Sequence, residues 1–161
     1  MNNSASPVVV TIGVFDGVHA GHRQVLGIAK SIAISLNGTL TAATFDPPPK
    51  AFLRPESFEG LLTLPKRRAE LLRESGVDHV ETLKFTDAMA HMSSDEFVEK
   101  ILLGALNAQV VIVGRNFRFG QGVIGRLLMI SQRNLADKSV RHFCSMLRHM
   151  PHLPGIEPNL Q

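Results

Sequence analysis

Apolar, β-branched runs alternate with amphipathic stretches along the first 114 residues. The predicted elements are strands over residues 8–14, 39–45, 77–85 and 109–114, and helices over residues 21–36, over residues 64–74 and from residue 93 onward. Continuous apolar strands are typical of parallel sheets that are covered on both faces, and helices supply the crossovers that such sheets need. The pattern therefore predicts an α/β fold, a doubly wound parallel sheet with helices on both faces.

Local signals set the ends of several elements. Thr63 is the predicted N-cap of the helix over residues 64–74, and Ser93 and Glu96 have the spacing of a capping box. The proline run after the second strand predicts a loop without regular structure over residues 46–62. A second loop, rich in Gly, Phe and Arg, is predicted over residues 115–123.

Three polar or glycine-rich loops follow predicted strands, at residues 13–16, 46–49 and 114–120. If the strands are parallel, their carboxyl ends meet at one edge of the sheet. Ligands of open α/β sheets bind beyond that edge. The three loops together therefore predict a binding site.

Composition is typical of a single globular domain. The chain has 161 residues, of which 44% are hydrophobic and 19% charged, enough to bury a core without disulfides. The one cysteine, Cys144, excludes an intrachain disulfide. The N-terminus lacks the pattern of a signal peptide, and the most apolar stretch, residues 101–114, is too short to span a bilayer. We therefore expect a soluble, cytoplasmic protein with no membrane association.

The net charge of +3 originates in the C-terminal part of the chain. Residues 1–125 hold 12 basic and 12 acidic side chains, whereas residues 126–161 hold 5 basic and 2 acidic ones. A basic tail can bind nucleic acid, but the chain has no Trp or Tyr to stack on bases. Small molecules are therefore the expected partners rather than nucleic acid, and the oligomeric state is left open.

Residues 13–22 combine the features of a phosphate site. A strand ends there, glycines allow a tight turn, and a helix begins, whose free N–H groups and dipole attract phosphate. His19 and His22 are three residues apart, so near a helix start they lie on one side. Imidazoles can donate hydrogen bonds to phosphate oxygens, which gain charge during nucleotidyl transfer. Ordinary surface histidines, or a zinc pair without a nearby Cys or third His, are the alternatives.

Three segments together resemble the FAD synthetases, which belong to the nucleotidyltransferase superfamily. Residues 15–22, F-D-G-V-H-A-G-H, are similar to the signature F-D-G-x-H-x-G-H. Residues 44–49 resemble the T-F-[DE]-P-x-P loop, and residues 113–120 resemble V-G-x-[DN]-F-x-F-G. Residues 93–98 also resemble a helix start of the family. The resemblance extends over residues 8–125 and implies a Rossmann-like sheet of the nucleotidyltransferase type.

The resemblance implies FMN adenylyltransferase activity, the step of FAD biosynthesis in which AMP passes from ATP to FMN, giving FAD and pyrophosphate with Mg²⁺. By the motif match, His19, His22 and Asn116 are the candidate catalytic residues. The other implied site residues are Gly13, Val14, Phe15, Asp16, Gly21 and Arg118 for ATP, and Phe45, Asp46, Pro47, Phe52 and Phe119 for flavin. A solvated Arg118 and packing roles for the phenylalanines remain the alternatives.

The chain departs from the family pattern in its last third. It ends before the riboflavin kinase barrel that follows in bifunctional members, so kinase activity is not expected. It also lacks the late I-S-S-T-x-[IV]-R motif, because residues 130–133, I-S-Q-R, lie too close to Gly120 and lack the second Ser and the Thr. We therefore assign residues 1–135 to a FAD synthetase-like nucleotidyltransferase domain, complete or incomplete, and residues 136–161 to a divergent basic tail.

The tail leaves two origins open, a replaced or out-of-frame end and a genuinely divergent short form. It also leaves two alternative functions. One is a non-catalytic or truncated nucleotide-binding remnant, which the missing motif favours. The other is a nucleotidyltransferase with a different phosphorylated acceptor, such as pantetheine phosphate or nicotinate mononucleotide.

Overall fold

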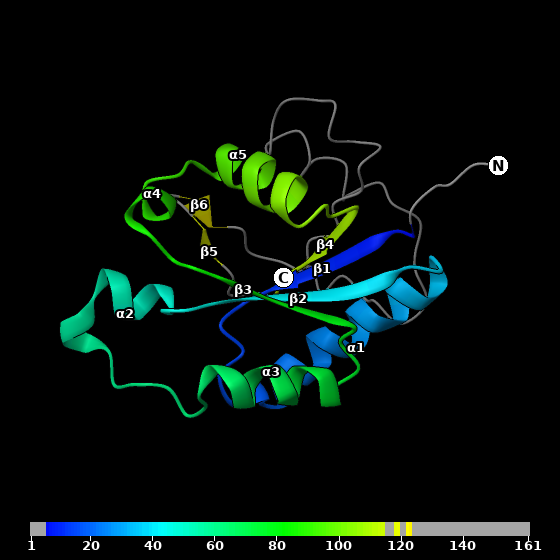
Figure 1. Cartoon of the computed structure of the whole chain (residues 1–161), viewed down its shortest axis with the longest axis horizontal. Helices are drawn as coiled ribbons and strands as arrows, with labels where there is room; N and C mark the ends of the chain where they lie inside the picture. The colour runs from blue at the N-terminus through cyan, green and yellow to red at the C-terminus, as the bar shows by residue number, and fades with distance from the viewer. Residues whose placement is uncertain (1–5, 115–117, 120–121, 124–161) are drawn as a thin grey trace, which may run out of the picture.

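A four-stranded parallel sheet organises the part of the chain that the computed structural model describes, residues 6–114, 118–119 and 122–123 (Figure 1). Its strands are β1 (Val8–Ile12), β2 (Thr39–Phe45), β3 (His79–Leu83) and β4 (Val110–Ile112). The strand order is β3-β2-β1-β4, and every neighbouring pair is parallel. The predicted parallel sheet is confirmed.

Helices cover both faces of this sheet. Helices α1 (Ala20–Ser35) and α3 (Pro65–Glu74) lie below it in Figure 1, whereas α4 (Asp87–Ala90) and α5 (Ser94–Phe97) lie above it. The π-helical η3 (Val98–Ala105) continues directly from α5. The predicted doubly wound arrangement is therefore confirmed.

Each face has its own hydrophobic cluster, and both clusters draw on the same strands. Successive side chains of a strand point to opposite faces. Accordingly, Val9 belongs to the cluster with Leu26 of α1, and Val10 belongs to the cluster with Leu102 of η3. This is why β1 and β2 are buried at nearly every position.

The predicted helix ends are found at two places. Asn37 has φ 51°, and the Gly38 amide donates to the Ala33 carbonyl at 2.8 Å, which ends α1 where the Asn-Gly pair predicted. At α5, the Ser93 hydroxyl accepts from the Glu96 amide and the Glu96 carboxylate accepts from the Ser93 amide, both at 3.1 Å. The predicted capping box is confirmed.

The loop predicted over residues 46–62 is wrong in part. It contains helix α2 (Pro49–Leu53) and the 3₁₀ turn η2 (Pro55–Ser57). Proline is tolerated in the first turn of a helix, because the N–H that it lacks has no helical partner there. Pro49 occupies this position, so the proline run starts a short helix instead of preventing one.

Two further predictions need correction. The N-cap of α3 is Leu64 and not Thr63, and no side chain caps this helix. Within residues 115–123, where a loop was expected, β5 (Arg118–Phe119) and β6 (Gly122–Val123) pair antiparallel. Among the described residues, no helix combines the length and the apolarity that crossing a bilayer requires.

Candidate nucleotide-binding site

A strained turn links β1 to α1. Its centre is the 3₁₀ turn η1 (Asp16–Val18), and Phe15, Gly17 and Val18 have φ angles of 52°, 66° and 43°. Positive φ is unfavourable for bulky side chains, above all for β-branched ones, and such strain is concentrated at functional sites. The side chains of Phe15 and Val18 are buried, so packing offsets part of the strain.

The two histidines of this segment lie against each other. His19 is the N-cap residue of α1, and His22 lies in the first turn of that helix. Their ring centroids are 3.7 Å apart, with an angle of 23° between the ring planes. A Cβ added at Gly21 would lie 3.2 Å from His19 Cε1, so the glycine leaves room for this ring. The expected placement of both histidines on one side of the helix start is found.

The surroundings of His22 favour its neutral form. Burial, followed by repulsion from His19, lowers the pKa of His22 to about 4, against the opposing effect of Asp16. The Phe15 ring meets His22 edge-on, at a centroid distance of 5.3 Å. His22 Nδ1 is enclosed and has no hydrogen-bond partner. A neutral imidazole still has one N–H to donate and one nitrogen to accept.

Asp16 ties the turn to the segment before α3. Its carboxylate accepts from the Leu62 amide at 2.8 Å, the Thr63 amide at 2.9 Å and the Thr63 hydroxyl at 2.8 Å. The Thr63 hydroxyl oxygen in turn accepts from the Gly17 amide at 3.2 Å. Burial alone would raise the pKa of Asp16, but these hydrogen bonds, with a smaller effect of Arg68, lower it. Asp16 is therefore a fixed anion with its oxygens already engaged.

The first two predicted loops adjoin at the carboxyl edge of the sheet. The Thr44 hydroxyl donates to the Val14 carbonyl at 3.0 Å, and the Gly13 amide donates to the Ala43 carbonyl at 3.0 Å. Gly114, which begins the third loop, follows β4 at the same edge and faces Val25 of α1. The convergence of loops that parallel strands predicted is found as far as the described residues extend.

The candidate flavin residues differ in how open they are. The ring of Phe45 is buried in the core and packs edge-on against Phe85. Phe52, on α2, is 39% exposed and also meets Phe85 edge-on. Asp46 and Pro47 are exposed just beyond β2. Phe52, Asp46 and Pro47 thus have accessible side chains, whereas Phe45 has not.

Three candidate residues belong to the third loop. Asn116 lies outside the described residues. Arg118 and Phe119 form β5, and only their backbone is described. Their assignment to catalysis, ATP and flavin stays a prediction.

The family comparison agrees with these motifs. The model of the FAD synthetase family matches residues 1–143. The chain belongs to the FAD synthetase family.

Two curated relatives are longer than this chain. The bifunctional riboflavin kinase/FMN adenylyltransferase of Pseudomonas fluorescens is 38% identical over 117 residues, 73% of this chain and 37% of that protein. The FAD synthetase of Listeria monocytogenes is 38% identical over 122 residues, 75% of this chain and 49% of that protein. The chain thus spans less than half the length of these relatives.

A solved structure supports the fold. A crystal structure described as a macrolide-efflux protein from Streptococcus pneumoniae superposes with a TM-score of 0.64 at 25% sequence identity. The match covers 83% of this chain and 43% of that one. The FAD synthetase-family chain therefore shares its architecture with a larger protein of known structure.

Two residues of the site are missed by sequence reasoning. Thr63 was expected to cap a helix, and a capping threonine cannot be told from one that binds a distant turn by local spacing alone. Arg68 lies in a run of basic residues, K-R-R, that reads as a solvated helix face, yet its side chain is 0% exposed. No local signal distinguishes it from its neighbours.

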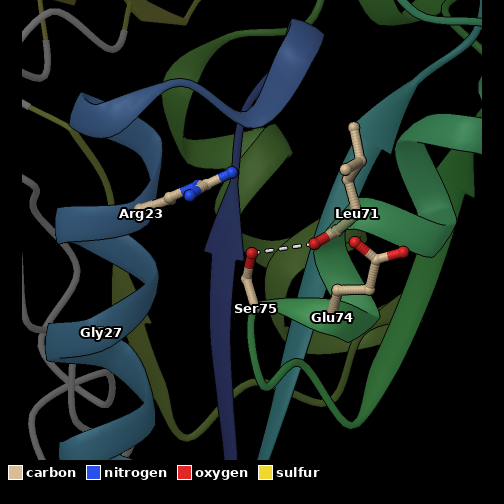
Figure 2. A pocket seen from close by; sticks show the side chains of 5 residues that line it. All are labelled: Arg23, Gly27, Leu71, Glu74 and Ser75. Carbon is tan, nitrogen blue, oxygen red and sulfur yellow. Dashed lines mark hydrogen bonds between the residues drawn. The ribbon is translucent and has the colours of Figure 1, made fainter.

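A separate pocket of about 360 Å³ lies between α1 and α3. Figure 2 shows Arg23 and Gly27 on its α1 side, and Leu71, Glu74 and Ser75 on its α3 side. Two of its polar side chains are engaged within the protein, because the Ser75 hydroxyl donates to the Leu71 carbonyl and Glu74 pairs with Arg67. Neither His19 nor His22 is among the residues that line it.

The described residues do not form a metal cage. Within them, no group of three or more His, Cys, Asp or Glu side chains could hold a metal ion. Asp16, the carboxylate nearest the turn glycine, is already engaged by Leu62 and Thr63.

Proposed function

We propose that this chain transfers AMP from ATP to FMN, giving FAD and pyrophosphate. Membership of the FAD synthetase family supports this choice of substrates. The observation that carries the proposal is the stacked pair His19 and His22 at the start of α1. The pair lies at the carboxyl edge of a parallel sheet, where such folds bind their ligands.

The proposed reaction is a direct displacement at phosphorus. A phosphate oxygen of FMN forms a bond to the α-phosphorus of ATP, and the bond from that phosphorus to the oxygen bridging to the β-phosphorus breaks. The electron pair of the broken bond leaves with pyrophosphate. This step needs no covalent nucleophile from the protein, so the chain has to position both substrates and stabilise charge on the transferred phosphoryl oxygens.

The histidine pair and the helix start would supply that charge stabilisation. Free N–H groups in the first turn of α1 attract phosphate. His22, neutral at pH 7 because burial lowers its pKa to about 4, would donate a hydrogen bond without undergoing a change of protonation. His19 is exposed at the helix start and can reach a ligand from solvent. Fixed donors of this kind are effective because they need no reorganisation during the reaction.

Magnesium would accompany ATP as part of the substrate. Mg²⁺ keeps several waters and binds through few carboxylates together with substrate phosphates. Such binding requires no protein cage, in accord with the engaged carboxylate of Asp16. The ion would supply neutralisation of the triphosphate charge when it is bound.

FAD formation tests the proposal. The chain is incubated with ATP, Mg²⁺ and FMN, and FAD is separated by chromatography. We expect product from the unsubstituted chain and a loss of about a hundredfold or more in His22→Ala, the typical cost of removing one fixed donor. His91→Ala is the matched control, because His91 is exposed beyond α4 and hydrogen-bonds only within that turn. Equal activity of His22→Ala and His91→Ala would refute the role of His22.

A second candidate is nucleotide binding without transfer. The sequence lacks the late S-S-T-x-x-R motif of the family, and this observation favours a non-catalytic protein. The FAD assay and a calorimetric titration with ATP together distinguish the two candidates, since a remnant would bind ATP yet form no FAD. Replacing FMN by another phosphorylated acceptor in the same assay tests the acceptor.

A further inference from the structure

Arg68 of α3 is a charged side chain enclosed within the protein. It is 0% exposed, whereas the adjacent Arg67 side chain is 51% exposed and pairs with Glu70 and Glu74. The guanidinium of Arg68 has one hydrogen bond, from Nη2 to the Phe45 carbonyl at 3.2 Å. Its Nε and Nη1 have no partner. Burying a charge costs free energy unless a partner compensates it, so this arrangement requires an explanation.

Among the described residues, no acidic side chain acts as a counter-ion for Arg68. No carboxylate there lies within 4 Å of the Arg68 guanidinium. Asp16 is close enough for Arg68 to help lower its pKa, but its oxygens are engaged by Leu62 and Thr63. The positive charge of Arg68 is therefore only partly balanced.

The position of Arg68 places this charge beneath the candidate site. The Phe45 carbonyl that it holds is the last of β2, directly before the loop of Asp46 and Pro47. Helix α3, which carries Arg68, packs against η1, the turn that precedes the histidine pair. The segment after β2 and the turn η1 both lie at the carboxyl edge of the sheet, and Arg68 is next to both.

We propose that Arg68 supplies a buried positive charge for the polyphosphate chain of a nucleotide bound at this edge. The inference rests on the site of the proposed function but not on turnover. Because the guanidinium is enclosed, it acts through its field and not by contact. Within a protein interior, where water screens charges weakly, one unit charge still acts on another across several ångströms. Arg68 is thus a binding residue, and its effect grows with the charge of the ligand.

The dependence of affinity on ligand charge tests this proposal. Adenosine, AMP, ADP and ATP are titrated calorimetrically into the unsubstituted chain, Arg68→Gln, Arg68→Lys and Arg67→Gln at constant ionic strength. We expect Arg68→Gln to weaken ATP about tenfold or more, with progressively smaller losses down to adenosine. Arg68→Lys keeps the charge and should retain most of the affinity. Arg67→Gln removes the same charge from the exposed neighbour and should change affinity little.

Two results would overturn the inference. An equal loss for adenosine and ATP in Arg68→Gln would indicate a merely structural role, and no loss for ATP would exclude any role. Circular dichroism reports whether each variant folds. If Arg68→Gln does not fold, Arg68→Met, which removes the charge but keeps an unbranched side chain in the buried space, replaces it in the same titration. An equal loss for adenosine and ATP, or no loss for ATP, in Arg68→Met refutes the proposal.

The outcome is separable from that of the proposed function. A chain that forms no FAD but shows the charge-graded loss in Arg68→Gln would keep this inference and refute the transferase. A chain that forms FAD, with equal affinities for ATP in Arg68→Gln and Arg67→Gln, would support the transferase and refute the inference about Arg68.

Discussion

His22 owes its protonation state to its neighbours. The Phe15 ring and the helix start withdraw it from water, and His19 stacks on it at 3.7 Å. Both effects disfavour the imidazolium, because burial penalises charge and a second positive ring repels it. The same two contacts fix the ring in place. Orientation and neutrality of this donor therefore have one structural origin.

Titration of His22 tests this account at the residue scale. We expect its ring signals in NMR to titrate with a midpoint of about 4, well below the usual 6.5. His19→Gln should raise the midpoint, because it removes the repulsion between the rings. His91→Gln, which changes an exposed histidine elsewhere, should leave it unaltered. A midpoint near 6.5 for His22 in the unsubstituted chain would contradict the prediction.

The same shift has a consequence for stability. Because the pKa of His22 is lower in the folded chain than in the unfolded one, the unfolded chain binds more protons between pH 6.5 and 4. The stabilisation by neutral His22 is therefore complete above about pH 6.5 and is lost as the pH falls toward 4. Urea unfolding of the unsubstituted chain and of His22→Gln at both ends of this range should show a smaller pH dependence in the variant.

At the scale of elements, two glycines of the α1 region have opposite requirements. Gly27 lies inside α1, and a Cβ added there would meet nothing within 4 Å. Gly38 joins α1 to β2, and a Cβ added there would clash with the Pro7 carbonyl oxygen, in the backbone that enters β1. We expect Gly27→Ala to stabilise the chain by about 0.5–1 kcal/mol, through helix propensity.

Gly38→Ala should instead destabilise the chain by about 1–3 kcal/mol, because backbone must shift to relieve the clash. Each variant serves as the control of the other, since both add one methyl group near α1. Urea denaturation followed by circular dichroism measures both. Similar midpoints for the two variants would show that the junction of α1 and β2 is looser than the structure has it.

The elements that the sequence predicts are those whose signals are local. Strands β1 and β2 follow from continuous β-branched and apolar runs, and the ends of α1 and α5 follow from Asn37-Gly38 and from the Ser93 capping box. Helix α2 was missed because its five residues hold no full amphipathic period and begin with the last proline of a proline run. Phe52 of this helix packs against Phe85, a contact distant in sequence that no local pattern predicts.

The candidate site divides in the same way. The histidine pair could be predicted, since its partners are three residues apart on one helix. The roles of Thr63 and Arg68 could not, because they depend on contacts with Asp16, Gly17 and Phe45 across more than twenty residues. These contacts form only because α3 packs against η1 and against the end of β2.

At the scale of the whole molecule, one sheet joins two hydrophobic layers. Leu26 of α1 is 0% exposed in one layer, and Leu102 of η3 is 4% exposed in the other. The strands between them contribute alternate side chains to both layers, as Val9 and Val10 of β1 do. If the helices of one layer unfolded, one face of the shared strands would be exposed to water, and these strands also support the other layer. The described domain should therefore unfold as one unit.

Leu26→Ala and Leu102→Ala test this cooperativity. Each should lower the free energy of unfolding by about 2–5 kcal/mol, the usual cost of truncating a buried leucine. Leu53→Ala, at a residue that is 57% exposed on α2, should change it by less than about 0.5 kcal/mol. In urea unfolding, both core variants should keep a single transition at a lower midpoint, with fluorescence of a bound dye and circular dichroism coinciding. Two separated transitions in either variant would mean that the layers fold independently, and the histidine site, which lies on the α1 side, would then be stabilised by only one of them.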